Sequence, residues 1–132
     1  MDEPHRASEK IRRVARLGVR FTLDDFGTGY SSLAYLSGLP INGLKVDRSF
    51  VRTLGEDQRS RAIITAIVRM AQALDIEVTA EGVETTMQLE ALRALDCQLA
   101  QGFHFHRPLP PEAVSSLLEQ TCERAICPTR AR

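Results

Sequence analysis

The stretch VRFTLDDFGTGYSSLAYLSGLPINGLKVD (residues 19–47) carries the pattern from which the fold can be predicted. It contains two short apolar runs, Val19–Leu23 and Ile41–Val46, and each run ends in polar residues. Such runs, rich in Val, Ile, Leu and Phe, are typical of strands buried on both faces of a parallel sheet. Between them, Ser31–Leu36 favours one or two turns of helix. The stretch therefore predicts two parallel strands joined by a short helical connection.

The rest of the chain repeats this alternation of strand and helix. A helix is expected before the stretch, over Ser8–Leu17, and two further strands after it, over Ile76–Ala80 and Leu99–Phe105. The other helices are expected over Arg59–Leu74, Thr86–Leu95 and Pro111–Glu123, where apolar residues recur at helical spacing. The order α(βα)4 predicts an α/β fold with parallel strands and outer helices.

Two architectures fit this order. Four βα units in 132 residues correspond to half of a TIM-type (β/α)8 barrel, which typically has about 250 residues. An open α/β sheet has the same alternation, and the pattern alone does not decide between the two. We expect one folded unit over residues 1–126 and a frayed tail over residues 127–132, which lack periodicity.

Composition limits the classes of partner. The 17 basic and 17 acidic side chains give a net charge near zero, which argues against binding to nucleic acid polymers. No apolar run approaches the roughly 18 residues of a membrane span, so we expect no membrane span in this segment. The three cysteines are spaced neither like a zinc site nor like a disulfide framework, which favours reduced thiols in a cytoplasmic protein.

Polar residues concentrate where the expected strands end. Asp24 and Asp25 close the first strand, Lys45 lies in the second, Glu81 follows the third and Gln101 lies in the fourth. Ligands of α/β proteins bind at the carboxyl ends of parallel strands. Paired carboxylates there suit Mg2+ or Mn2+, and two such ions are a common device for phosphodiester hydrolysis. An isolated Asp-Asp pair is also typical of a solvated turn or a helix cap.

Lys45 stands inside an apolar strand. A buried ammonium group is costly unless it is paired, so we expect it to meet carboxylates, a phosphate or a metal-bound water. Two plain alternatives remain open. The side chain could extend out to solvent, or it could form a purely structural ion pair with Glu81.

Four motifs together resemble a known family. LDDFGTGYSSL (Leu23–Leu33), LKVD (Leu44–Asp47), AEGVE (Ala80–Glu84) and QGF (Gln101–Phe103) are similar to the later motifs of bacterial EAL domains, and the likeness runs over Leu17–Pro110. The resemblance implies a TIM-type barrel that uses two Mg2+ or Mn2+ ions. It also implies hydrolysis of cyclic di-GMP to pGpG in bacterial second-messenger signalling.

The resemblance also implies roles for single residues. Asp24 and Asp25 would ligate the metal pair, and Lys45 would hold the attacking water or a metal-bound hydroxide. Glu81 would act as a ligand or general base near the metals, and Gln101 would support the substrate or the water. The loop from Phe26 to Leu33 would be the family's mobile segment, linked to catalysis and to dimer contacts.

The family's remaining metal ligands lie on early strands that this chain does not contain. A literal Glu90-Ala91-Leu92 falls in the expected helix over Thr86–Leu95, with Glu90 on its outward face, so we interpret it as coincidental. We therefore expect the isolated fragment to be inactive, and the sequence leaves open whether this chain acts as an enzyme. The alternative is a non-catalytic nucleotide-binding or protein-interaction remnant of an EAL domain.

Half a barrel leaves unpaired strand edges. Exposed edges are templates for pairing with another chain. We therefore expect a homo-oligomer, or pairing with the missing half-barrel.

Overall fold

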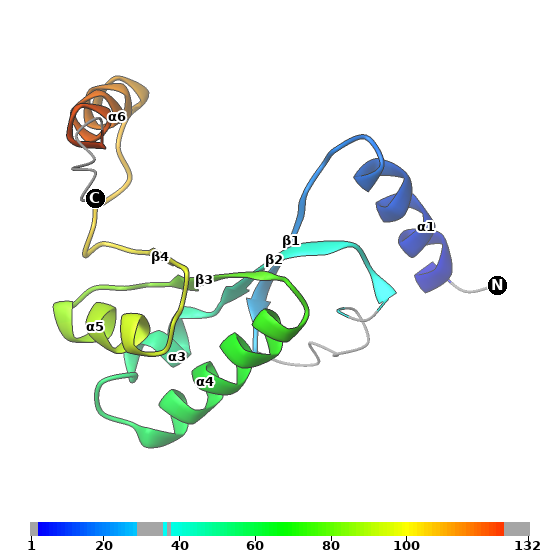
Figure 1. The fold of residues 1–132 in the computed structure, drawn as a ribbon, viewed down its shortest axis with the longest axis horizontal. Helices are drawn as coiled ribbons and strands as arrows, with labels where there is room; N and C mark the ends of the chain where they lie inside the picture. Colours follow the sequence, from blue (N-terminus) through cyan, green and yellow to red (C-terminus); the bar gives the residue numbers. More distant parts are fainter. Residues whose placement is uncertain (1–2, 29–35, 37, 126–132) are drawn as a thin grey trace, which may run out of the picture.

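A parallel four-stranded sheet forms the centre of the molecule (Figure 1). The computed structural model describes residues 3–28, 36 and 38–125. The strands follow the order β1-β2-β3-β4 and are β1 (Phe21–Phe26), β2 (Ile41–Val46), β3 (Glu77–Glu81) and β4 (Leu99–Gln101). The helices are α1 (Glu3–Ala15), α3 (Arg48–Arg52), α4 (Gln58–Ala73), α5 (Thr86–Ala94) and α6 (Pro111–Ala125). The predicted parallel sheet with flanking helices is confirmed.

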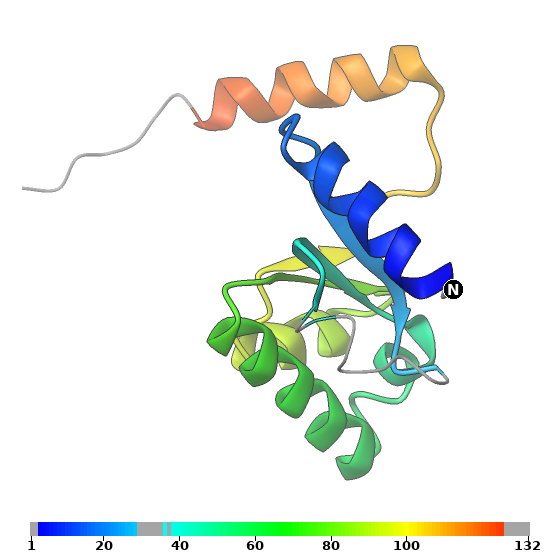
Figure 2. The same cartoon turned by 90° about the vertical axis from the view of Figure 1, so that its right-hand side faces the viewer.

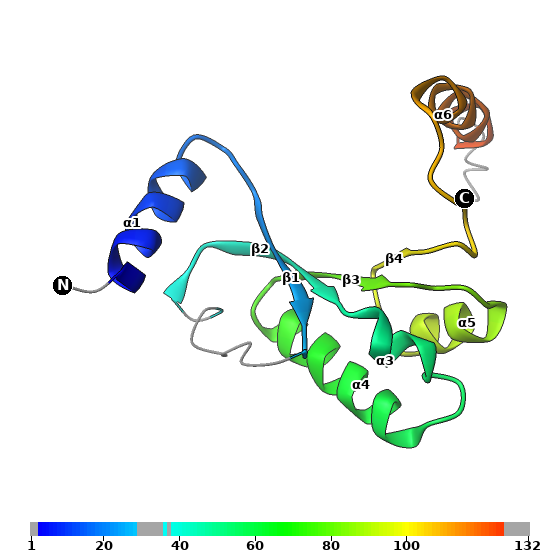
Figure 3. The same ribbon diagram turned by 180° about the vertical axis from the view of Figure 1, so that it is seen from behind.

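The helices are distributed unevenly around the sheet. α3, α4 and α5 cover one face, and the other face is left uncovered because α1 and α6 stand away from the sheet (Figures 1 and 3). α1 precedes the edge strand β1 in the chain, and α6 follows the opposite edge strand β4. Turned by 90°, the molecule shows α6 and α4 on opposite sides of the sheet (Figure 2). Within the described residues no helix is both long enough and apolar enough to cross a membrane.

The hydrophobic core lies between the sheet and α3–α5. Leu44, Val46 and Val78 face the helices and are fully buried, and they belong to one cluster with Ile64 and Val68 of α4. Side chains alternate between the two faces along a strand, so the neighbours of these residues lie on the uncovered face.

The uncovered face is therefore largely polar. Of the described strand residues, Leu99 is the one large hydrophobic that is exposed. The other exposed large hydrophobics include Val14 of α1 and Val114 and Leu118 of α6, which lie outside the sheet. The expected pairing of the edge strands β1 and β4 with another chain stays a prediction.

Helix caps explain where several helices begin. Asp57 caps α4, because its carboxylate accepts hydrogen bonds from the backbone of Arg59 and Ser60. Thr85 and Gln88 form a reciprocal capping box at the start of α5. These caps account for the agreement of both helices with the predicted ranges to within one residue.

The body of α5 also agrees with the sequence analysis. Glu90 is exposed while Leu92 is buried against the core, so the literal Glu-Ala-Leu motif lies in the outer layer of helices.

Some boundaries differ from the sequence-based ranges. β1 begins at Phe21 and runs through both aspartates, whereas the sequence suggested that it stops before them. β4 ends at Gln101, four residues before its predicted end. The residues that follow leave the sheet and form a turn next to Val83. The backbone N–H of His104 donates to the Val83 carbonyl, which draws the chain away from the sheet. The helix expected over Ser31–Leu36 lies outside the described residues except for Leu36.

Candidate metal centre

A bulge near the end of β1 brings two neighbouring carboxylates to one side. Leu23 pairs with Leu44 and Phe26 with Val46, so β1 uses one more residue than β2 over the same interval. Asp25 has φ 50°, in the left-handed region that aspartate tolerates better than most residues. In a regular strand Asp24 and Asp25 would point to opposite faces. The bulge removes this alternation.

Asp24, Asp25 and Glu81 form a carboxylate cluster at the carboxyl ends of the strands. One oxygen from each of the three side chains lies within 4.8 Å of the others. Glu81 ends β3, two strands away from β1, and the parallel topology brings both strand ends to the same edge. Three convergent carboxylates fit a hard divalent cation, which prefers oxygen ligands. The structure thus brings the predicted ligands together, and their role as ligands stays a prediction.

Lys45 lies on β2, between the strands that carry the cluster. Its Nζ atom makes an ion pair with Glu81 and lies 3.3 Å from Oδ1 of Asp24. The hydrogen bond to Glu81, supported by Asp24, raises the pKa of Lys45 despite the opposing effect of burial. The side chain is only 27% exposed, so it does not extend freely into solvent as one alternative supposed. Its ammonium group carries one positive charge and contacts two of the three carboxylates.

The loop that leaves the bulge is held against α3. The Thr28 hydroxyl donates to the backbone oxygen of Asp25 at 2.9 Å. Gly27 has φ 102°, and a Cβ atom at this position would lie 2.5 Å from Cε2 of Phe50. The close approach of the Phe50 ring therefore requires glycine and fixes the chain just beyond Asp25.

Replacing Gly27 by alanine should destabilise the protein by more than the same change at Gly18. Both glycines have positive φ, but nothing lies within 4 Å of a Cβ atom built at Gly18. Gly18→Ala should therefore show the backbone cost alone, about 1–2 kcal/mol, and Gly27→Ala a further 1–3 kcal/mol or so from the clash with Phe50. Denaturant unfolding measures both, and equal losses would contradict the proposed contact.

An open hollow of about 680 Å³ lies beside the cluster. Asp25, Glu81 and Gln101 all line it, so the structure places the predicted substrate residue Gln101 next to the predicted metal ligands. The carbonyl of Gln101 accepts a hydrogen bond from the backbone of Val83 at 3.0 Å. A Cβ atom on the next residue, Gly102, would collide with the backbone of Val83. This tight packing fixes the backbone of Gln101 at the rim.

The hollow also contains residues that the sequence analysis did not assign to the site. Arg48 and Phe103 line it, and both are exposed. Asp47 lines it too, and its carboxylate caps α3 by accepting from the backbone of Ser49 at 2.8 Å. A hydrogen bond from the Ser49 side chain, and to a lesser degree the one from its backbone, lowers the pKa of Asp47. In the sequence, Asp47 at the end of the second strand could have indicated that a helix begins at Arg48, because aspartate is a preferred residue at the N-cap.

Comparison with known sequences identifies relatives over most of the chain. The model of the EAL domain family matches residues 1–108. The cyclic di-GMP phosphodiesterase NbdA of Pseudomonas aeruginosa is 50% identical over 121 residues. That match covers 92% of this chain but 16% of NbdA. The chain thus spans about a sixth of the length of this relative.

Solved structures give the same result for the fold. The EAL domain of Mycobacterium smegmatis DcpA superposes with a TM-score of 0.85 at 35% identity, covering 91% of this chain and 54% of that one. Klebsiella pneumoniae BlrP1, solved as a manganese and cyclic di-GMP complex, superposes with a TM-score of 0.70 at 38% identity. This match covers 76% of this chain and 26% of BlrP1. Because EAL domains are TIM-type barrels, these matches favour the half-barrel over the open sheet.

Proposed function

Because the chain belongs to the EAL domain family, we propose that it is the C-terminal half of a metal-dependent phosphodiesterase domain that hydrolyses cyclic di-GMP to pGpG. The observation that carries this proposal is the convergence of Asp24, Asp25 and Glu81 at the carboxyl ends of the strands. The similarity to NbdA and to the complex of BlrP1 supports the choice of substrate. We assign residues 1–126 to this half-domain and propose that it acts in the bacterial cytoplasm.

The three carboxylates would hold two Mg2+ or Mn2+ ions together with ligands from the other half of the barrel. When bound, the cations supply positive charge for the phosphate and lower the pKa of a water molecule. Glu81 is the less exposed carboxylate of the two that contact Lys45, at 18% against 62% for Asp24. It can serve as a ligand or accept a proton from the attacking water.

Lys45 and Gln101 would act on the reacting groups directly. The ammonium group of Lys45 has three donors, so it can contact carboxylates and still orient a water for attack. The amide of Gln101 lies at the rim of the hollow, where it can donate to a phosphate oxygen or accept from a water. Both residues would thus position the nucleophile and the substrate relative to each other.

We further propose that the isolated chain is inactive and pairs with a second copy or with the other half of the barrel. β1 and β4 are the edges of the sheet, and their outer backbone groups are available for pairing. The exposed Val14 and Leu118 lie on α1, which precedes β1, and on α6, which follows β4, and such a partner would cover them.

Metal removal from the complete domain, which is this chain together with the other half of the barrel, tests the proposed function. The purified complete domain should convert cyclic di-GMP to pGpG with Mg2+ or Mn2+, and turnover should fall to background in EDTA and return when the ion is restored. Chromatography of the nucleotides measures this. Cyclic di-GMP binding without turnover at any ion concentration would instead favour the non-catalytic remnant.

A further inference from the structure

Arg48, the first residue of α3, is the cationic residue on the rim of a hollow that is otherwise acidic. Asp25, Asp47, Glu81 and Glu84 line the same hollow. Among the described residues that line it, Arg48 alone carries a positive charge. An anionic substrate that enters this hollow meets repulsion from the carboxylates unless cations offset it.

The backbone of Arg48 is fixed next to the carboxylate cluster. Gly82 directly follows Glu81 and has φ 73°, and a Cβ atom built on it would lie 2.5 Å from Cβ of Arg48. The first turn of α3 is therefore in direct contact with the end of β3. Asp47 caps this turn through its hydrogen bond to the backbone of Ser49. The cap and the contact together hold Arg48 at the rim.

The guanidinium group of Arg48 has no ion pair or side-chain hydrogen bond among those of the described residues, although its charge helps to lower the pKa of the neighbouring Asp47. The ion pairs found there join Arg20 to Glu77, Lys45 to Asp24 and Glu81, and Arg69 to Asp96. Arg48 is exposed and takes part in none of them. Lys45, in contrast, is already balanced by two carboxylates. The donors of Arg48 are therefore available to a ligand, although four acidic residues line the same hollow.

We propose that Arg48 binds the phosphodiester group of cyclic di-GMP that is not being cleaved. This inference rests on the proposed function and goes beyond it by assigning a partner to the second phosphate. Both phosphates of a cyclic dinucleotide are charged, and only the one at the cations is neutralised during cleavage. The planar guanidinium matches two phosphate oxygens in a bidentate arrangement, which a lysine cannot reproduce.

Substitution of Arg48 in the complete domain tests the proposal. Arg48→Gln should raise the KM for cyclic di-GMP about tenfold or more and change kcat by less than about threefold, because the lost contact binds the substrate without taking part in cleavage. Arg48→Lys should lie between wild type and Arg48→Gln. Arg52→Gln is the matched control, since Arg52 lies on the same helix, is exposed and does not line this hollow. It should keep the wild-type KM.

Two further measurements separate the possible outcomes. The affinity of Mn2+ for Arg48→Gln should equal that of wild type, which shows that the carboxylate cluster is intact. An active wild type whose KM is unchanged by Arg48→Gln, or raised equally by Arg52→Gln, overturns the role of Arg48 alone. A wild-type domain that neither binds nor cleaves cyclic di-GMP overturns the proposed function and this inference with it. If Arg48→Gln does not fold, the KM of Arg48→Lys decides by the same criterion.

Discussion

Changing Asp24 or Asp25 to asparagine in the complete domain is expected to lower turnover of cyclic di-GMP by roughly a thousandfold or more. Each substitution keeps the size of the side chain but removes a negative charge from the cluster in which oxygens of Asp24, Asp25 and Glu81 lie within 4.8 Å of one another. Asparagine also tolerates the left-handed conformation of Asp25, so the bulge should persist. Initial rates at saturating Mn2+, together with Mn2+ titration calorimetry, measure the effect.

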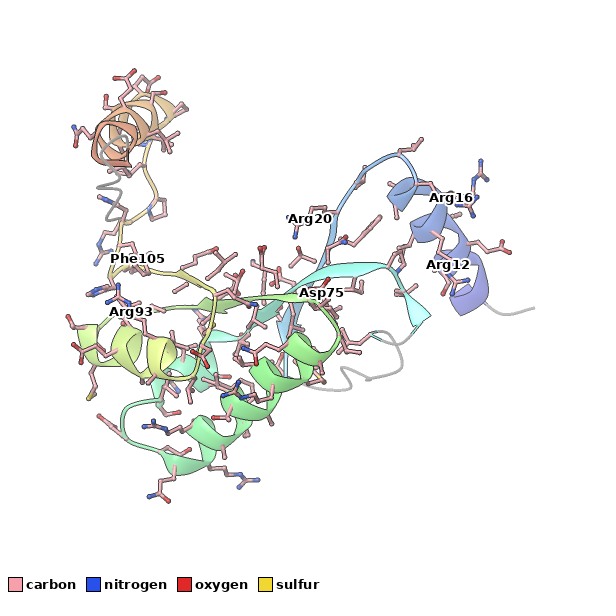
Figure 4. The ribbon with its side chains drawn as sticks, viewed as in Figure 1. Arg12, Arg16, Arg20, Asp75, Arg93 and Phe105 are labelled. Atoms are coloured by element: carbon pink, nitrogen blue, oxygen red, sulfur yellow. The ribbon has the colours of Figure 1, made fainter. Side chains whose placement is uncertain are left out.

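Asp75→Asn is the matched control for Asp25→Asn. Asp75 is also exposed and has φ 56°, but it precedes β3 and so lies at the opposite end of the sheet (Figure 4). Its substitution should leave both turnover and Mn2+ affinity unchanged. Near-normal turnover of Asp24→Asn and Asp25→Asn would remove both residues from the metal site. A loss in Asp75→Asn as large as in Asp25→Asn would point to a general effect of the left-handed turns.

The order of strands and helices could be predicted because it depends on local patterns. β2 coincides with its predicted range, and α4 and α5 agree to within one residue. Their apolar residues face a core that lies on one side of the sheet. The convergence of strand ends could be predicted as well, because parallel strands present their carboxyl ends at one edge. Asp24 and Glu81 therefore meet although 57 positions separate them in the sequence.

The bulge at Asp25 could not be predicted from alternation. Side chains alternate between the two faces of a regular strand, so neighbouring aspartates are expected on opposite faces. A single extra residue in the strand switches the face of every side chain beyond it. The register of β1 against β2 decides the matter, and register is set by the partner strand. Gly27, two residues after Asp25, was the local indication that the strand ends irregularly, since glycine permits the positive φ that residue 27 adopts.

Arg48 was missed because α3 is too short to show helical periodicity. Five residues, Arg48–Arg52, do not complete two turns, so no apolar repeat can be seen in them. The helix is held by its Asp47 cap and by the burial of Val51 rather than by its own propensity. Short elements fixed by tertiary contacts are thus the ones that sequence patterns miss, and here one of them borders the candidate site.

The remaining prediction separates a catalytic Lys45 from a structural one. Lys45→Met keeps the volume and the apolar stem but removes the donors that would orient a water. Asp24, 62% exposed, can be hydrated when it loses its partner, whereas Glu81 is only 18% exposed. We therefore expect destabilisation of about 1–2 kcal/mol, which lowers the Tm of a complete domain by a few degrees. Turnover should fall by roughly a hundredfold or more, with cyclic di-GMP still bound.

The measurements are thermal melts, nucleotide binding and turnover on the same preparations. Because Glu81 raises the pKa of Lys45 above its ordinary value, the ion pair stabilises the fold fully at neutral pH. This contribution is lost only as the pH rises through the folded-state pKa, so melts at pH 7 report the charged pair. Arg20→Met is the control, because Arg20 pairs with Glu77 at the amino end of the sheet (Figure 4). It should change neither turnover nor binding. A large loss of stability in Lys45→Met, with turnover per folded molecule unchanged, would leave Lys45 only the structural role.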